Sequence, residues 1–299
     1  MEISASQVKE LREKTGVGMM ECKKALQENN GDLEKAIVWL RERGMSRAAK
    51  KADRVAAEGM VEVYVNEDKN AGVVVEINCE TDFVSKNNDF INFAKDVAAL
   101  ALKNKANSTE KLLALPLKNG QSVEQTITNL IATIGENIKI RRVSVLTSDN
   151  GTIVGYSHMG GKIGTLVKLE GSKAPAVVDL GKDLAMHVAA SAPRYLKPEE
   201  VDALEIEQER QIARKKLLEE KKPENLIEKI TEGQISKFYK EVCLLEQPFV
   251  KDPAIAVKKL VADSGKGASL NGFVRYQLGE GIEKKTLSFA DEVNAVAKA

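Results

Sequence analysis

Apolar residues recur at helical spacing through the first 45 residues, which indicates three short helices. Val8 and Leu11 share the inner face of the first helix, and the glycines of residues 15–18 break it. The second helix, from about residue 20 to 28, ends at an Asn-Asn-Gly stop, and Asp32 caps the third. A unit of this size makes only a marginal core, so we expect its stability to depend on contacts with neighbouring parts of the chain.

From residue 55 onwards the pattern changes to the alternation that is typical of strands. Two strands followed by a helix occur twice, at residues 59–65, 73–77 and 89–102 and again at 154–158, 164–169 and 179–190. The repetition predicts an α+β fold with two duplicated core subdomains, each an antiparallel sheet with helices on one face. We expect a strand at residues 138–146 to bridge them, a last core helix at 248–260 and a closing strand at 273–278.

Residues 199–239 are densely charged and carry only a thin apolar seam, formed by Val201, Leu204, Ile212 and Leu218. We predict two antiparallel helices that project as an arm, with Pro223 opening the second. Residues 288–299 have the pattern of a C-terminal helix whose apolar stripe should pack on its own core or on a partner.

These patterns divide the chain into five parts. They are a helical domain with its linker at residues 1–54, a first core subdomain at 55–140, a second at 141–190 with 240–281, the arm at 191–239 and a C-terminal helix module at 282–299. The basic, alanine-rich run at residues 47–54 is interpreted as the linker or as a solvated helix, and a nucleic-acid contact is the alternative.

Composition narrows the classes of function. The chain is 43% hydrophobic and 30% charged, which is typical of a soluble globular protein. Its net charge of +1 and its 4% of aromatic residues argue against a direct nucleic-acid partner, which usually requires a basic excess or stacking platforms. No apolar stretch approaches the ~18 residues of a membrane helix, and no signal-peptide pattern opens the chain. Three widely spaced cysteines fit free thiols in a reducing compartment, so we expect a cytoplasmic location.

Catalytic chemistry of the chain's own is not expected. His158 and His187 are the only histidines, and no acid–imidazole–nucleophile set can be assembled around them. Gly161-Lys162 and two similar pairs lack the upstream glycine and the following hydroxyl of a phosphate-binding loop. The sequence therefore predicts neither an enzyme, nor a metal site, nor a cofactor.

The most informative stretch is residues 76–86, EINCETDFVSK, between a strand-like run and a helix-like run. Phe83 belongs to neither pattern and follows the acidic Asp82 in a connection that should lie at the surface. An aromatic offered to solvent beside a carboxylate suits insertion into a partner protein. The alternative is that Phe83 folds back onto the core, as loop aromatics often do.

A second candidate contact lies near the N-terminus. Gly16 and Gly18 let the backbone turn tightly and place Met19 and Met20 at a helix start. Adjacent residues cannot both face one small core, so we expect one methionine to be exposed, where its flexible side chain adapts to a partner. The alternative is that both pack internally.

Two long signatures resemble those of elongation factor Ts, the nucleotide-exchange factor of the GTPase elongation factor Tu. They are residues 11–26, LREKTGVGMMECKKAL, and residues 76–86, and the likeness continues through 134–137, 158–164, 247–250 and the C-terminal end. The N-terminal helices also resemble the ubiquitin-associated (UBA) three-helix module. Because organelle members carry transit peptides, the start of this chain favours a bacterial product or a processed one.

The resemblance implies that the partner is elongation factor Tu, GDP-bound and nucleotide-free. Residues at the first contact would disturb the Mg²⁺ site, namely Thr81, Asp82, Phe83 and Val84. A second set would displace the phosphate-binding loop, namely Ile134, Gly135, Glu136 and Asn137. The remaining contacts would be Leu11, Met19 and Met20 in the N-terminal domain, and His158 and Val250 elsewhere. The C-terminal helix would also return to the nucleotide domain of the partner.

Two features limit the resemblance. Lys162 stands where many members have arginine, and the two are not interchangeable at a bidentate contact, so a contact role is not carried over to it. Some members also use the arm to form homodimers, but the thin seam here leaves a solvated hairpin without a partner equally open.

Two other classes of function remain. A binding scaffold would use the Met19-Met20 turn and the charged arm without accelerating nucleotide release from any GTPase. An enzyme is the third class, and turnover by the pure protein would reveal it.

Overall fold

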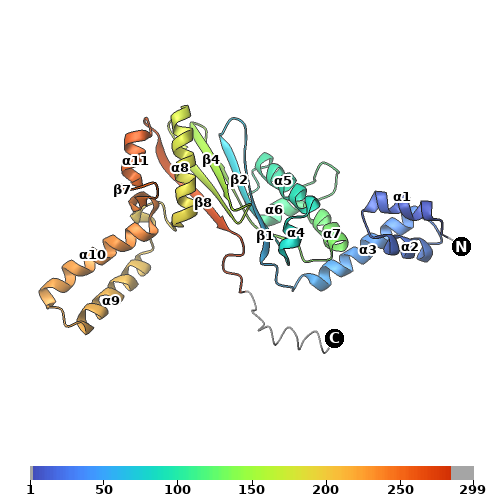
Figure 1. Cartoon of the computed structure of the whole chain (residues 1–299), viewed down its shortest axis with the longest axis horizontal. Coiled ribbons are helices and arrows are strands. Elements are labelled where there is room, and N and C mark those ends of the chain that lie inside the picture. The colour runs from blue at the N-terminus through green and yellow to red at the C-terminus, as the bar shows by residue number, and fades with distance from the viewer. Residues whose placement is uncertain (1–2, 284–299) are drawn as a thin grey trace.

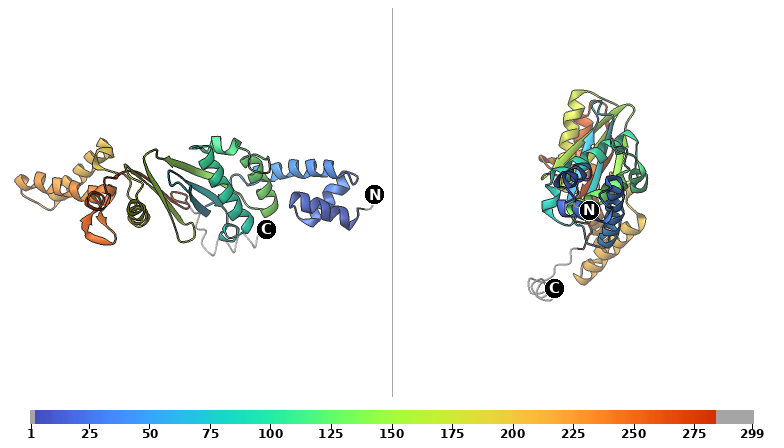
Figure 2. Two further views of the ribbon diagram at one scale, coloured as in Figure 1. Left: turned by 90° about the horizontal axis from the view of Figure 1, so that it is seen from above. Right: turned by 90° about the vertical axis from the view of Figure 1, so that its right-hand side faces the viewer.

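A computed structural model describes residues 3–283 of the chain (Figure 1). The molecule is elongated, with a helical module at one end, a core of strands and helices in the middle and a helical hairpin at the other end (Figures 1 and 2). The mixed helices and small antiparallel sheets confirm the predicted α+β class. The C-terminal helix predicted at residues 282–299 falls almost wholly outside the described residues.

The N-terminal module consists of α1 (Ala5–Thr15), α2 (Met19–Glu28) and α3 (Leu33–Lys51), as the apolar spacing predicted. Ser4 begins α1 with a capping box, and Gly16 ends it at a φ of 69°, which favours glycine. α3 continues through the first part of the expected linker to Lys51, because its alanine-rich sequence contains no helix breaker, and residues 47–51 therefore form an extension of the helix. The likeness of this module to UBA domains stays a prediction.

The first sheet has the strand order β1 (Glu58–Val65), β2 (Ala71–Cys79) and β3 (Lys139–Thr147), all antiparallel. One face packs on α5 (Asn88–Lys103), α6 (Thr109–Ala114) and α7 (Val123–Ile134) around a core that includes Phe90, Val97 and Ile127. The strand expected to bridge the subdomains is β3, and it completes this first sheet instead. The domain boundary expected after residue 140 therefore falls inside β3, because strand pairing between distant residues leaves no local signal.

The second sheet has the order β4 (Gly151–His158), β5 (Ile163–Glu170) and β8 (Ser269–Gln277), with α8 (Pro175–Ser191) on its outer face. The helix predicted at residues 248–260 is shorter than expected. It begins only at α11 (Val257–Ser264), after a small hairpin of β6 (Pro248–Phe249) and β7 (Asp252–Ala256). Pro248 and Pro253 lack the amide donors that a helix interior needs, which favours the hairpin.

The two sheets pack face to face, with the helices on the outside of each (Figure 1). Val61 and Val74 of the first sheet meet Ile153 and Leu166 of the second in a buried apolar layer. A Cβ atom at Gly164 would lie 2.5 Å from Val61 Cγ1, so the glycine permits the close approach. Each sheet thus has helices on one face, as predicted, because the other sheet covers the second face.

A buried carboxylate joins the two sheets at one edge. Glu76 of β2 is fully buried and accepts hydrogen bonds from the side chains of Arg141 and Arg142 and, at 2.8 Å, from the amide of Gly279. Burial alone would raise the pKa of Glu76, but these hydrogen bonds and the charge of Arg142 outweigh it and hold the pKa below its ordinary value. The end of the second sheet is thereby fastened to the first.

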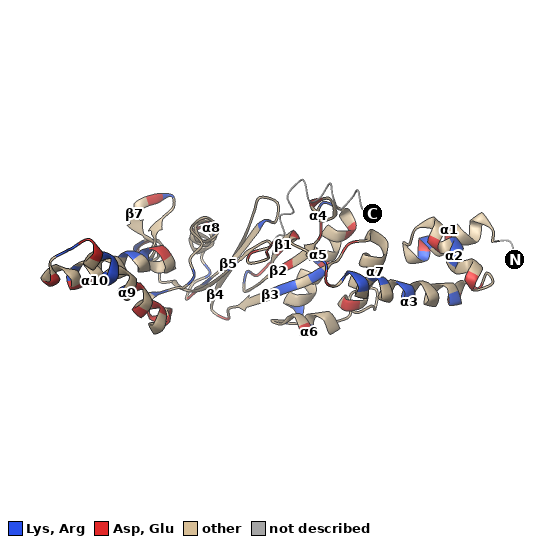
Figure 3. Cartoon of the chain, turned by 90° about the horizontal axis from the view of Figure 1, so that it is seen from below, with Lys and Arg blue, Asp and Glu red and all other residues tan. Residues whose placement is uncertain are grey.

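The predicted arm is present as α9 (Ala203–Glu219) and α10 (Glu224–Val242), and two short 3-10 turns, Pro198–Glu200 and Leu244–Glu246, flank it. Lys, Arg, Asp and Glu residues intermix along both helices (Figure 3). Arg214 pairs with Glu228 across the hairpin at 2.6 Å, whereas Leu204 and Ile212 stay exposed. No helix among residues 3–283 is long and apolar enough to cross a membrane.

Candidate functional site

Phe83 projects from a single helical turn, α4 (Asp82–Ser85), that follows β2. The hydroxyl of Thr81 caps this turn by accepting from the amide of Val84 at 3.5 Å. The side chain of Phe83 is 81% exposed, whereas Val84 beside it is 8% exposed and packs on the core. The structure therefore contradicts the alternative in which Phe83 folds back. Asp82 is held beside it by Lys86, at 2.7 Å, so the aromatic and the carboxylate are presented together.

Two loops that are distant in sequence meet beneath Phe83. One oxygen of Glu136 accepts from the amides of Glu80 and Thr81 at 3.1 and 2.9 Å, and the other accepts from the Thr81 hydroxyl at 2.6 Å. In return, the carboxylate of Glu80 accepts from the amide of Asn137 at 2.6 Å. We call these four bonds the loop clasp. They join residues 80–85 and 134–137 into one surface.

Asn137 and Gly135 connect the loop clasp to the end of α3. Asn137 is 3% exposed, and its amide group donates to the carbonyls of Ala52 and Arg54 at 3.2 and 2.8 Å. The ammonium group of Lys51 donates to the carbonyl of Gly135. The side chain of Asn137 is therefore turned into the chain, where it supports the loop clasp, and its role as a direct contact stays a prediction.

Cys79 lies under the same surface, and its thiol is unreactive. Its thiol is buried and donates to the carbonyl of Thr81 at 3.1 Å. Burial, followed by the charges of Glu136 and Glu58, raises its pKa to about 12. Such a thiol has almost no thiolate at neutral pH, so Cys79 serves as a small buried side chain rather than a nucleophile.

The N-terminal contact residues divide into exposed and buried ones. Met19 and Met20 are 54% and 77% exposed at the start of α2, so the alternative that both pack internally is contradicted, and both rather than one face solvent. Leu11 has no exposed surface and packs inside the core of the module. Leu11 therefore supports the module in the free chain, and its contact role stays a prediction.

His158 ends β4 at the tip of a hairpin. Its Nδ1 lies 2.8 Å from the hydroxyl of Tyr156, and Met159 beside it is 72% exposed. Lys162 pairs with Glu58 of β1 at 2.9 Å, and Glu58 lies opposite Cys79 in the strand register. The hairpin tip is therefore held beside the end of β2, which leads into α4 and Phe83. The ammonium group of Lys162 is paired within the chain.

Val250 lies in the turn of the β6–β7 hairpin with its side chain 47% exposed. Its amide donates to Nδ1 of the buried His187 at 3.1 Å, and Nε2 of that ring donates to the side-chain oxygen of Gln247 at 2.9 Å. Both bonds need the neutral ring with its proton on Nε2. Burial lowers the pKa of His187, and the bond to Gln247 opposes this only in part. His187 is thus structural, as expected, and it holds the turn that presents Val250.

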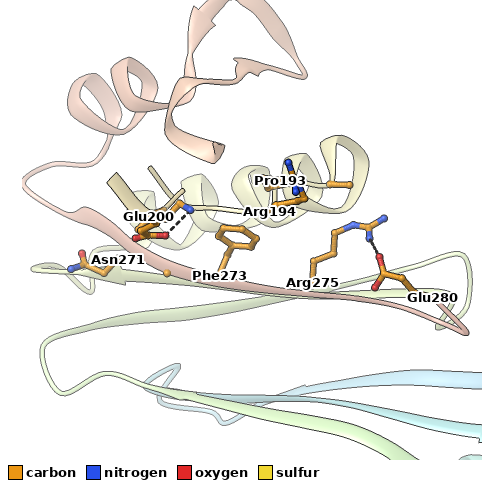
Figure 4. Close-up of a pocket in the computed structure, with 10 residues that line it drawn as sticks. Pro193, Arg194, Glu200, Asn271, Phe273, Arg275 and Glu280 are labelled. Carbon is orange, nitrogen blue, oxygen red and sulfur yellow. Dashed lines mark hydrogen bonds and ion pairs between the residues drawn. The ribbon is translucent and has the colours of Figure 1, made fainter. Parts of the chain in front are cut away.

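A hollow of about 520 Å³ opens between the end of α8 and β8 (Figure 4). Its charged groups already have partners within the chain. Arg275 lies 3.6 Å from Glu280, and Glu200 accepts from the amide of Leu196 at 2.9 Å. Among residues 3–283, no cluster of His, Cys, Asp and Glu could hold a metal ion. The exposed residues of the loops and turns are therefore better candidates for function than this hollow.

Two family descriptions match the sequence. Residues 80–280, more than half of the chain, match the family described as Elongation factor TS. The chain belongs to the elongation factor Ts family. Residues 1–48 match the description Elongation factor Ts, mitochondrial, N-terminal. A protein of Clostridium botulinum (strain Eklund 17B / Type B) named Elongation factor Ts is 48% identical over 296 residues, which cover 97% of this chain and 98% of that protein.

Membership of the elongation factor Ts family confirms the identification made from the two signatures, and it supports nucleotide exchange on elongation factor Tu. The structure brings residues 81–84, residues 134–137 and the His158 hairpin close together, and it leaves Met19, Met20 and Val250 further along the molecule. Sequence reasoning gave His187 a structural role but missed the bond that it makes to Val250, and it missed the supporting role of Glu80. The hydrogen bonds that define these supporting roles join residues more than 50 positions apart, and local sequence patterns do not predict such bonds.

Proposed function

We propose that this member of the elongation factor Ts family releases GDP from elongation factor Tu by inserting Phe83, with Asp82 beside it, near the Mg²⁺ and phosphate site. The observation that carries the proposal is an 81% exposed phenylalanine on a turn whose neighbours are fixed. Phe83 has the largest exposed fraction of the large apolar side chains in residues 3–283, and an aromatic anchor that becomes buried on binding is a common source of binding energy at interfaces.

The free energy needed to weaken GDP binding can be supplied by an interface that contains Phe83. A factor that binds the empty GTPase more tightly than the GDP-bound form weakens GDP binding by the same ratio. Weakening GDP by ~10⁴-fold needs about 5.5 kcal/mol of differential binding. One interface hot spot contributes roughly 2–4 kcal/mol, so Phe83 and a few further anchors are sufficient. Mg²⁺ is an effective point of attack because it bridges the phosphates and oxygen ligands of the GTPase.

The other exposed residues would extend the interface. The backbone of Ile134 and Gly135 would face the phosphate-binding loop, and Met19 and Met20 would pack on the nucleotide domain. His158 and Val250 would contact more distant parts of the partner. The exposed Leu204, Ile212 and Leu218 of the arm support association with a second copy of the chain. The working location would be the cytoplasm, where elongation factor Tu acts.

This role needs no catalytic residue, metal or cofactor of the chain's own, because exchange makes and breaks no covalent bond. The scaffold alternative shares the exposed surfaces and differs only in leaving GDP release unchanged. Release of a fluorescent GDP analogue from purified elongation factor Tu, with and without the chain, therefore separates the two.

The decisive substitution is Phe83→Ala. We expect GDP release to slow by roughly 30-fold or more, since truncating a hot spot costs roughly 2–4 kcal/mol and each 1.4 kcal/mol is tenfold. Stability should change little, because the side chain is already exposed to water. The measurement is the release rate at saturating factor, together with the thermal midpoint of the variant.

Leu204→Ala is the matched control, because Leu204 is also exposed, at 73%, but lies on the arm. It should release GDP at the wild-type rate. A folded Phe83→Ala variant that exchanges as fast as this control would rule out the wedge.

A further inference from the structure

We propose that Glu136 is a positioning residue that fixes Phe83 from inside the chain, through Thr81, rather than a residue that touches the partner. The inference rests on the proposed function, since it concerns how Phe83 is presented. It differs from the family-based expectation that Glu136 acts on the phosphate-binding loop.

The bonds of Glu136 all point inward. Its two oxygens accept from two consecutive amides and one hydroxyl of the Glu80–Thr81 segment, at 2.6 to 3.1 Å. The oxygen that receives both amides has no lone pair left for a partner. Hydrogen bonds to a charged acceptor are roughly twice as strong as neutral ones, so this is a firm tether.

Phe83 depends on such a tether because α4 cannot hold itself. A helix of four residues is too short to be stable alone, and Val84 is its one buried residue. The position of the turn must therefore come from its attachments. Val84 supplies one attachment by packing on the core, and Thr81 supplies the polar ones, since its hydroxyl caps α4 and donates to Glu136.

The loop clasp works in both directions. Glu80 reaches back to the amide of Asn137, while Glu136 holds the amides of Glu80 and Thr81. Residues 80–85 and 134–137 therefore move as one body. A side chain that is fixed before binding loses less conformational entropy on binding, so the tether should raise the effectiveness of Phe83 without any contact of its own.

Non-additivity of substitutions tests the proposal. Glu136→Ala in the full chain should slow GDP release by about tenfold, as expected when a charge-assisted tether is lost. In the Phe83→Ala background the same substitution should change the rate by less than about twofold, because no wedge remains to be positioned. Equal fold-changes in the two backgrounds would show a direct contact and overturn the proposal, as would an unchanged rate for Glu136→Ala alone.

Hydrogen exchange of the free chain gives a second readout that needs no partner. The amides of Glu80 and Thr81 should lose protection in Glu136→Ala and keep it in the control Glu124→Ala, which removes an exposed carboxylate from α7, the helix that ends just before Glu136. Unchanged protection in Glu136→Ala would contradict the tether. If wild-type chain fails to accelerate GDP release, the proposed function fails, but this readout still decides whether Glu136 holds the turn.

Glu136→Gln is a milder substitution that still tests the proposal if the alanine variant does not fold. Its amide oxygen can still accept from the two backbone amides, and its NH₂ group can donate to the Thr81 hydroxyl. We expect its release rate and amide protection to lie between those of wild type and Glu136→Ala. A folded Glu136→Gln variant with no protection left at Glu80 and Thr81 would also overturn the proposal.

Discussion

At the scale of single residues, buried side chains fix the positions of the exposed residues that are proposed to contact the partner. His187 is the clearest case, because it is fully buried and neutral and fixes the amide of Val250. Exposure of Phe83 and of one of the two methionines could be predicted from the sequence, since Phe83 lies outside the local apolar pattern and adjacent methionines cannot both face one small core. Their supports could not, because a bond from Glu136 to Thr81 depends on how distant segments fold together.

The neutral state of His187 predicts a pH dependence of stability. Its folded pKa lies below the ordinary value of 6.5, so the unfolded chain takes up a proton as the pH falls below 6.5 while the folded chain does not. The free energy of unfolding should therefore fall by up to about 1.4 kcal/mol per pH unit from this group, until the pH reaches the lowered folded pKa.

The measurement is urea unfolding between neutral pH and the mildly acidic range for wild type and for His187→Gln. The His187 variant should lose that part of the slope of stability against pH. Identical slopes for the variant and wild type would show that His187 does not resist protonation.

At the scale of elements, local rules explained the helices and non-local contacts decided the sheets. Ser4 and Asp32 cap α1 and α3, and the cap at Asp32 is the one that the sequence predicted. The pairing of β3 with β2 escaped prediction because the two strands are separated by four helices, and only the folded chain shows which strand lies next to which. The face-to-face packing of the sheets escaped it for the same reason.

The sheet interface predicts a strong effect at one glycine. Gly164→Ala should destabilise the chain by roughly 1–3 kcal/mol, because the new Cβ would lie 2.5 Å from Val61 Cγ1 and 2.7 Å from Val63 Cγ2. Gly272→Ala, on β8 with open space around the position, is the matched control and should be almost neutral. Urea unfolding compares them, and equal stability of the two variants would show that the sheets can separate without cost.

At the scale of the whole molecule, the proposed contacts lie on the module and the core, and the arm extends from the opposite end (Figure 1). The sequence predicted these parts and their order, since each has its own pattern of charge and apolar spacing. It could not predict their arrangement, because contacts such as that of Lys51 with Gly135 join segments from different parts.

This arrangement predicts that the outer half of the arm is dispensable for exchange. Replacing residues 211–231 by a short glycine-rich turn keeps the pairing of Arg210 with Glu232 and removes the tip. GDP release should stay within about twofold of wild type, because sites this far apart act independently. A large loss of exchange in the folded, shortened chain would place a partner contact on the arm.

The close approach of α3 to α7 has a mechanical consequence. A Cβ at Gly44 would lie 3.2 Å from Ala132 Cβ, so the absence of a side chain at Gly44 lets the two helices approach closely. The part of α3 before Gly44 spans about 16 Å at 1.5 Å per residue, and a tilt of about 5° would shift its start by roughly 1.4 Å. A larger side chain at Gly44 would therefore change where the methionine-bearing module lies relative to the core.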